Sequence, residues 1–500
     1  MKTDKDIQPN NTDTGVPVTC NLPKANATCN LQLAAGDNKR ILILDGATGT
    51  ALQKFGLTEA DFRGEEFAGH PIPLKGNNDV LNITRPDVIR RVHQSYIEAG
   101  VDIIETNTFN ANAVSQAEYG CTEWITRINR EGARIAKEAA TACREREILV
   151  AGSIGPTDKS LTLAPDPEQP AYRIVDFDTL VAAYTTQVTA LIEGGVDLLL
   201  VETIYDGLNA KAALYAIAKV QEERRTQLPV MLSATINDKS GRTLTGQSLD
   251  ALFTSLSHYP IVSFGLNCSF GAKELHQFIR ELAPHIPCAI SIYPNAGLPN
   301  EMGEYNESPE FTAQCLQNMA KEGLINIAGG CCGTTPEHIR AIAEVLKNIP
   351  PREIPVSEHR LKVSGLETVI VDKEQSNFIN IGERTNVAGS AKFARLIREK
   401  NYTEAAIIAR KQIEAGASII DINMDDAMLD GTAEMERFVR IISNEPDIAK
   451  APLIIDSCRI EKFTREMYRE LHQLERRGRR ISAQGERNTT PRGGSRGYGF

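Results

Sequence analysis

The sequence lacks any run of apolar residues long enough to cross a membrane, which takes about 18 consecutive residues. Its first residues, MKTDKDIQPNNTDTG, also lack the apolar core of a secretory signal. Ten cysteines in 500 residues are too sparse for the disulfide framework of a secreted protein. The eight histidines show no HExxH spacing, which argues against a histidine metal site. We therefore expect a cytoplasmic protein without a membrane partner, in which cysteines serve as ligands, nucleophiles or core residues.

Basic residues are in the minority, with 55 Lys and Arg against 65 Asp and Glu and a net charge of −10. This balance argues against nucleic acid as a partner. Hydrophobic residues make up 41% of the chain and charged residues 24%, which is ordinary for a folded globular protein. A chain of this length is predicted to form two or three domains.

Residues 1–38 are polar and show little periodicity, so we expect a flexible arm there. Within residues 39–350, short β-branched runs alternate with segments of helical periodicity. Eight parallel strands, each followed by a helix, predict an α/β fold of the (β/α)8 TIM-barrel type, with an open doubly wound sheet as the alternative. The predicted strands span 41–46, 102–107, 148–153, 197–203, 230–235, 261–267, 289–295 and 324–330.

Three cysteines follow predicted strands: Cys268 after the sixth, and Cys331 and Cys332 after the eighth. Active sites of such barrels lie at the carboxyl ends of the strands, so these thiols are expected to converge there. A catalytic zinc keeps three protein ligands and an open fourth position, which matches the number of thiols. The alternative is that the cysteines fill small gaps in the core.

Two acidic residues also end predicted strands. Asp45 begins the turn Asp-Gly-Ala-Thr-Gly-Thr after the first strand, and Glu202 lies at the end of the fourth. The turn glycines would let backbone N–H groups approach a substrate carboxylate, although the same turn could simply cap a helix. Glu202 belongs either to the site or to an ion pair with a neighbouring base.

Five segments together resemble the zinc-dependent homocysteine S-methyltransferase domain: LDGATGT, ETNTF, VETI, GLNCSFG and GGCCGTTPEHI. The resemblance covers about residues 40–350. It implies zinc on Cys268, Cys331 and Cys332, with the thiolate of L-homocysteine in the open position. It also implies that the amino acid end of homocysteine is held by Asp45 and Glu202, helped by the backbone of Gly46, Ala47 and Thr48.

The chemistry of such a centre suits methyl transfer. A free thiol has a pKa of about 8.5, so little of it is nucleophilic thiolate at neutral pH. Zinc coordination deprotonates the thiol. Three cysteine thiolates already over-neutralise Zn²⁺, so a fourth sulfur keeps much of its electron density, and soft ligands favour zinc over magnesium or calcium.

A polar linker is expected over residues 351–376, followed by a second αβ pattern over residues 377–458 with strands at 378–384, 418–425 and 452–457. These strands resemble the start of the pterin-binding barrel of the cobalamin-dependent methionine synthases. The polar residues that end them are candidates for binding the pterin, although they could equally cap helices. They are Glu383, Asn386, Asp421, Asn423 and Asp456.

Residues 459–500 are basic and glycine-rich and show no strand signal. They could form a disordered tail or an RNA-binding arm. We favour a truncated or frameshifted end, because three βα units fall short of a second barrel. On this interpretation the pterin-binding barrel is incomplete and the cobalamin-binding module is absent from the chain.

The predicted function is that of a homocysteine S-methyltransferase of the methionine synthase type. The zinc-bound thiolate would accept a methyl group from methylcobalamin, which 5-methyltetrahydrofolate recharges in the full-length enzymes. Two alternatives stay open. One is a methyltransferase that uses betaine or another onium donor, and the other is a non-catalytic zinc-binding remnant.

Overall fold

The computed structural model describes residues 40–301, 303, 305–356, 360–372 and 378–457. The predicted arm over 1–38 and the predicted tail over 459–500 lie outside them. In the first part of the chain, eight parallel strands form one sheet. They are β1 (Leu42–Ile43), β2 (Ile103–Glu105), β3 (Leu149–Ile154), β4 (Leu198–Ile204), β5 (Val230–Ala234), β6 (Ser263–Gly271), β7 (Ala289–Asn295) and β8 (Ile327–Ala328).

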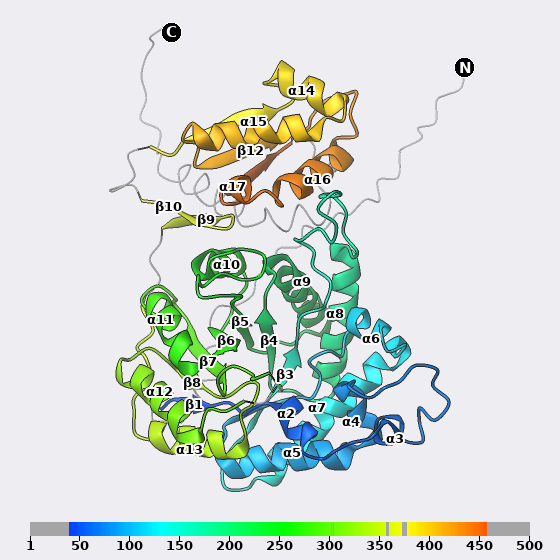
Figure 1. The fold of residues 1–500 in the computed structure, drawn as a ribbon, viewed down its shortest axis with the longest axis vertical. Helices are drawn as coiled ribbons and strands as arrows, with labels where there is room; N and C mark the ends of the chain where they lie inside the picture. Colours follow the sequence, from blue (N-terminus) through cyan, green and yellow to red (C-terminus); the bar gives the residue numbers. More distant parts are fainter. Residues whose placement is uncertain (1–39, 302, 304, 357–359, 373–377, 458–500) are drawn as a thin grey trace, which may run out of the picture.

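The strand order β1-β8-β7-β6-β5-β4-β3-β2 brings the first two strands back together. A parallel bridge joins Leu44 to Ile103, and the amide of Asp102 donates to the carbonyl of Ile43 at 2.7 Å. The sheet therefore closes on itself, which confirms the predicted TIM barrel over the doubly wound alternative (Figure 1).

Helices surround this barrel because their apolar faces need a partner. In α5 (Pro86–Ala99), a proline begins the helix and Gly100 ends it with a φ of 107°. The other long helices are α7 (Ile125–Ala142), α8 (Phe177–Glu193), α9 (Gly207–Arg224), α10 (Leu249–Leu256), α11 (Ala272–Leu282), α12 (Pro309–Lys321) and α13 (Pro336–Leu346). Shorter ones are α2 (Thr48–Gln53), α3 (Glu59–Arg63), α4 (Leu81–Thr84), α6 (Ala113–Ala117), η1 (Asn78–Val80) and η2 (Thr122–Trp124).

Alternate side chains of the strands fill the barrel interior. Ile103, Leu200 and Ile327 belong to this inner cluster, separate from the layer between strands and helices. Because side chains alternate along a strand, Glu105 and Glu202 are the next inward positions on β2 and β4. Cys331, beyond β8, packs against the same cluster. The inner layer therefore becomes polar at the carboxyl ends of the strands.

A second, smaller parallel sheet has the order β11-β12-β13 and its own buried cluster. Among the described residues it holds three strands, fewer than a closed barrel needs, in line with the predicted incomplete second barrel. Its elements are β11 (Ile381–Asn386), α14 (Ala391–Arg398), α15 (Tyr402–Glu414), β12 (Ile419–Asn423), α16 (Gly431–Ile442), α17 (Pro446–Ala449) and β13 (Leu453–Asp456).

An antiparallel hairpin lies within the segment predicted as a linker, formed by β9 (Leu361–Ser364) and β10 (Thr368–Val371). The turn of this hairpin bonds to both parts of the chain. The amide of Leu366 donates to the carbonyl of Ala449 beside the small sheet at 2.8 Å, and the carbonyl of Leu366 accepts from the amide of Ser248 in the barrel at 3.0 Å. The loop between β3 and α8 makes a second junction, where Asn444 donates to Pro170 at 3.0 Å. The small sheet and its helices therefore pack on one side of the barrel (Figure 1).

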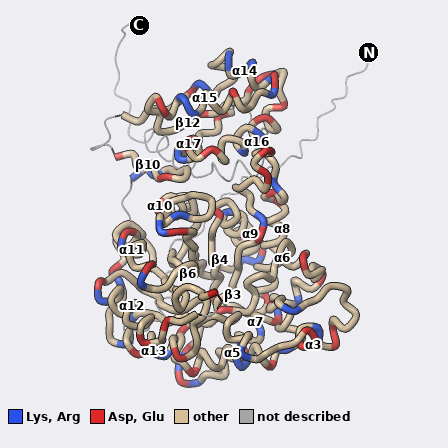
Figure 2. The backbone as a smooth tube through the Cα atoms, in the orientation of Figure 1, with Lys and Arg blue, Asp and Glu red and all other residues tan. Residues whose placement is uncertain are grey.

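None of the helices in the described ranges is both long and apolar enough to span a membrane. Figure 2 shows Lys and Arg intermixed with Asp and Glu along the outer helices. Many of these side chains form surface ion pairs, such as Arg90 with Glu138 at 3.2 Å. Such pairs contribute little to stability individually, so the energy of the fold resides mainly in the buried clusters.

Arg352 closes the end of the first barrel from within the core, with 4% of its surface exposed. Its guanidinium donates to the carbonyls of Ala283, Ile286 and Cys288 at 3.1, 2.6 and 3.0 Å. We expect Arg352→Met to lower the free energy of unfolding by about 3 kcal/mol, because three buried carbonyls lose their donors. Urea denaturation measures the change, with the exposed Arg340→Met as control; equal values for the two variants would contradict this account.

Candidate active site

The three cysteines singled out from the sequence meet at the carboxyl ends of the barrel strands. The sulfur atoms of Cys268, Cys331 and Cys332 all lie within 4.8 Å of one another, and all three residues are half-buried. The Sγ atoms of Cys268 and Cys332 are 4.0 Å apart. In a tetrahedral zinc site with Zn–S distances of 2.3 Å, the sulfurs are about 3.8 Å apart. The donor set therefore fits a soft divalent metal with little rearrangement.

Backbone geometry places these sulfurs together. Cys268 has a φ of 61°, in the left-handed region, so it departs from the alternation that would turn its side chain outward. The amide of Cys331 donates to Pro294 at 2.7 Å, and the carbonyl of Cys332 accepts from Ala296 at 2.9 Å. The strained residue and the two anchors hold the ligands in place before any ion binds.

Small residues let the loop after β8 approach its neighbours. A Cβ on Gly330 would lie 2.4 Å from the hydroxyl oxygen of Thr334, and one on Gly46 would lie 2.8 Å from the same oxygen. That hydroxyl donates to the carbonyl of Cys331 at 2.7 Å and accepts from the amide of Ala47 at 3.2 Å. Thr334 therefore joins the turn after β1 to the cysteine loop, and neither glycine can be replaced without moving it.

The thiols share their protons unevenly. Hydrogen bonds from the Cys331 and Cys332 thiols lower the pKa of Cys268 to about 3. The same contact with Cys268 raises the pKa of Cys332 to about 11 and that of Cys331 well above its usual value. The cluster thus favours the thiolate form of Cys268, and the thiolate is the form of cysteine that binds a metal cation.

Three carboxyl groups lie in the same mouth: Asp45 follows β1, Glu105 ends the neighbouring β2, and Glu202 lies on β4, with β3 between the last two. Asp45 and Glu202 are 1% and 4% exposed, and Glu105 is half-buried. The amide of Glu105 donates to Asp45 Oδ2 at 3.1 Å, whereas Asp45 Oδ1 has no hydrogen-bond partner among the described residues. Ser153 donates to Glu202. Burial raises the pKa of all three carboxyls, to about 7 for Glu202, and the mutual repulsion of their charges adds to the effect on Asp45 and Glu105.

The raised pKa of Glu202 gives stability a defined pH dependence. The folded protein holds a proton on Glu202 between its ordinary pKa of 4.5 and its folded value of about 7, while the unfolded chain has released it. The free energy of unfolding should therefore fall as pH rises through this interval. Glu202→Gln removes this titration. The free energy of unfolding of the variant, relative to that of the unaltered protein, should therefore rise by on the order of 3 kcal/mol between pH 4.5 and 7.5. Urea denaturation of metal-free protein tests this; a pH-independent difference would count against it.

Two residues at this mouth were not among the sites predicted from sequence. Asn267, 1% exposed, donates to Thr203 Oγ1 at 2.8 Å and lies with its Nδ2 3.9 Å from the sulfur of Cys331. The side-chain oxygen Oδ1 of Asn267 accepts from the hydroxyl of Ser233 at 2.7 Å. Glu105 is the other residue. Asn267 ends a predicted strand and Glu105 lies near the carboxyl end of another, and that position is the signal by which they can be found.

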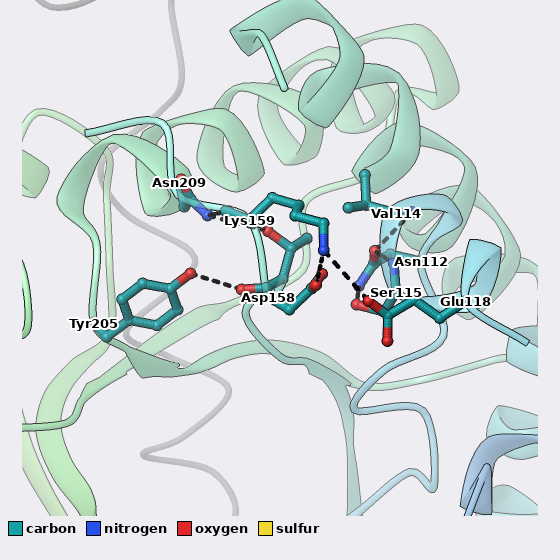
Figure 3. A network of polar contacts seen from close by, with 9 residues as sticks. Asn112, Val114, Ser115, Glu118, Asp158, Lys159, Tyr205 and Asn209 are labelled. Carbon is teal, nitrogen blue, oxygen red and sulfur yellow. Dashed lines mark hydrogen bonds and ion pairs between the residues drawn. The ribbon is translucent and has the colours of Figure 1, made fainter. Parts of the chain in front are cut away.

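The loop after β3 carries a separate polar network (Figure 3). The ammonium of Lys159 lies between Asp158 and Glu118, 3.3 Å from the latter. Tyr205 donates to the carbonyl of Thr157 at 2.7 Å, and Asn209 donates to that of Lys159 at 2.8 Å. These contacts fix the loop, and they pair Lys159 with acids other than the three carboxyls.

The second sheet brings its predicted residues to one edge. Asn423 lies opposite both Asn386 and Asp456 in register, and its Nδ2 donates to Asp456 at 2.9 Å. Asp421 is buried, and its pKa is raised to about 6 by burial and then by the charges of Asp456 and Glu383. Asn386 also accepts from the amides of residues 388 and 389, which fixes the loop before α14, whereas the N-cap of that helix is Ser390. Glu383 and Asp456 are exposed at the edge.

Comparison with known proteins gives two family matches. Residues 42–346 match the model described as Homocysteine S-methyltransferase, and residues 382–466 match that described as Pterin binding enzyme. Among solved structures, the oxidized form of the homocysteine methyltransferase MmuM from Escherichia coli is 24% identical, covering 62% of this chain and 98% of that one, with a TM-score of 0.49. Its metallated form is 25% identical, covering 63% and 99%, with a TM-score of 0.45.

Proposed function

Since this chain belongs to the homocysteine S-methyltransferase family and is therefore a methyltransferase, we propose that its first barrel methylates L-homocysteine on zinc in the manner of the methionine synthases. The observation that carries the proposal is the convergence of Cys268, Cys331 and Cys332, whose sulfurs lie within 4.8 Å of one another. Three thiolates leave one tetrahedral position for a substrate sulfur.

Zinc bound there would supply the Lewis acidity that keeps the homocysteine sulfur deprotonated at neutral pH. The chain's own residues do the rest. Asp45 and Glu202 lie in the same mouth, where their carboxyls would bind the α-ammonium of homocysteine. Asn267, held by Thr203 and Ser233, orients the Cys331 sulfur. The substrate would thus be fixed at its amino end and at its sulfur, which orients the thiolate toward the donor.

The turn after β1 would complete the amino acid site. Gly46 and Ala47 lie directly before α2, which begins at Thr48. The amide of Ala47 is 3.2 Å from Thr334 Oγ1, so Thr334 holds this turn against the cysteine loop. Because Ala47 already donates its amide to Thr334, we propose that within the Gly46, Ala47 and Thr48 turn the amides of Gly46 and Thr48 face the substrate carboxylate.

For the donor we propose methylcobalamin, recharged by 5-methyltetrahydrofolate. The support is the second sheet, which carries the match to the pterin-binding family and collects Asn386, Asp421, Asn423 and Asp456 at one edge. These residues, with Glu383, offer hydrogen-bond partners for the edge of a flat heterocycle. An onium donor would require no such edge.

The donor is tested by assaying zinc-loaded protein with L-homocysteine and either methylcobalamin or betaine. We expect methionine to form with methylcobalamin and not with betaine. Methionine formed from betaine or another onium compound without cobalamin would overturn the donor assignment and leave the homocysteine site intact. No methionine from any donor, together with no response of the metal to homocysteine, would favour a non-catalytic zinc protein.

A further inference from the structure

A third carboxyl, Glu105, accompanies the two acids that the family resemblance assigns to homocysteine. It is the last inward-facing residue of β2, two positions beyond Ile103 in the barrel's inner cluster. Its amide donates to Asp45 Oδ2 at 3.1 Å, so the two residues are adjacent. Glu105 is half-buried, whereas Asp45 and Glu202 are 1% and 4% exposed. Its carboxyl therefore faces the same interior as those of Asp45 and Glu202, whose charges act on it.

None of the described lysines and arginines forms an ion pair with Glu105 or with the two acids beside it, Asp45 and Glu202. Lys159, on the loop after β3, is paired with Asp158 and Glu118. Arg40, at the opposite end of β2, is paired with Asp102. Burial and mutual repulsion favour the protonated form of these carboxyls, so a ligand that brings a positive charge would stabilise their ionised form.

An α-ammonium group has three N–H donors. Two carboxylates satisfy two of them with charged acceptors, and a third carboxylate completes the set. We infer that Glu105 is a further specificity-determining residue, which contacts the α-ammonium of homocysteine together with Asp45 and Glu202 and selects thiols that carry an amino group. This inference rests on the proposed function of the same mouth.

Isothermal titration of the zinc-loaded, full-length protein tests the inference with two ligands: L-homocysteine and 4-mercaptobutanoic acid, which lacks only the amino group. Glu105→Gln keeps the shape of the side chain and removes its charge. We expect it to weaken homocysteine binding about 10- to 100-fold, the range for a lost charge-assisted hydrogen bond, and to leave 4-mercaptobutanoate affinity within about twofold. Glu98→Gln, an exposed glutamate on α5, is the matched control and should change neither affinity.

The outcomes separate the inference from its premise. If the unaltered protein binds homocysteine and Glu105→Gln binds both ligands as the unaltered protein does, the inference fails and the proposed function stands. An equal loss for both ligands means a merely structural role and also overturns it. Failure of the unaltered, zinc-loaded protein to bind homocysteine overturns the proposed function itself. Because the substitution relieves repulsion among three acids, Glu105→Gln should also melt no lower than the unaltered protein and keep its zinc.

Discussion

Replacing Cys332 by alanine is expected to abolish stoichiometric zinc binding and homocysteine methylation while leaving the barrel folded. Removal of one of three thiolates should weaken the affinity for zinc by about 100-fold or more, since the binding free energy of a structural zinc site is roughly 10–16 kcal/mol shared among its ligands. Without the metal, only a few per cent of the homocysteine thiol is ionised at neutral pH, and its position is no longer fixed. Methyl transfer should therefore fall by at least about 100-fold.

The matched control is Cys315→Ala. Cys315 is also a half-buried free cysteine, but it lies on α12 and is not part of the sulfur cluster. Metal analysis by mass spectrometry should find one zinc per chain in the control and almost none in Cys332→Ala. Because Cys332 is only half-buried, the two variants should melt within a few degrees of each other in the metal-free state. Retention of zinc by Cys332→Ala would show that this sulfur is not a ligand.

Asp45→Asn should raise the KM for homocysteine by about 100-fold with little change in kcat, because it removes a buried charge that binds the ground state and the transition state alike. The amide oxygen of asparagine can still accept the hydrogen bond from Glu105, so the turn should keep its shape. The main-chain carbonyl of Asp45, which accepts from Gly330 at 3.1 Å, is unaffected by the substitution.

Steady-state kinetics with varied homocysteine measure this effect, and zinc content must stay at one per chain. Asp87→Asn serves as the control, since Asp87 is exposed on α5 and pairs only at the surface with Arg85. A fall in kcat with an unchanged KM would contradict the role of Asp45 in binding. Loss of zinc from Asp45→Asn would mean that it supports the metal site instead.

The barrel is readable from the sequence because its eight strands are buried on both faces and stand out as continuous apolar runs. Polar residues such as Glu202 and Cys331 follow these apolar runs at their carboxyl ends. Because all the strands are parallel, these ends lie at the same face of the barrel. Closure of the sheet then follows from the number of βα units. Figure 1 shows the strands of the barrel with the helices packed around them.

Other features depend on local geometry that the sequence pattern does not reveal. The left-handed φ of Cys268 breaks the alternation of β6, so the inward direction of its side chain cannot be deduced from strand periodicity. Asn267 contacts Cys331 across 64 positions of sequence, and only the folded barrel brings them together. The hairpin of β9 and β10 has short strands of mixed burial, which read as a polar linker.

Zinc ligation by Cys268, Cys331 and Cys332 can be measured by X-ray absorption at the zinc edge, with and without L-homocysteine. We expect one zinc per chain with three sulfur ligands and one lighter ligand, and a fourth sulfur when homocysteine is added. A sulfur count that homocysteine leaves unchanged, or purified protein that binds no zinc, would contradict the claim that Cys268, Cys331 and Cys332 hold a metal for substrate activation.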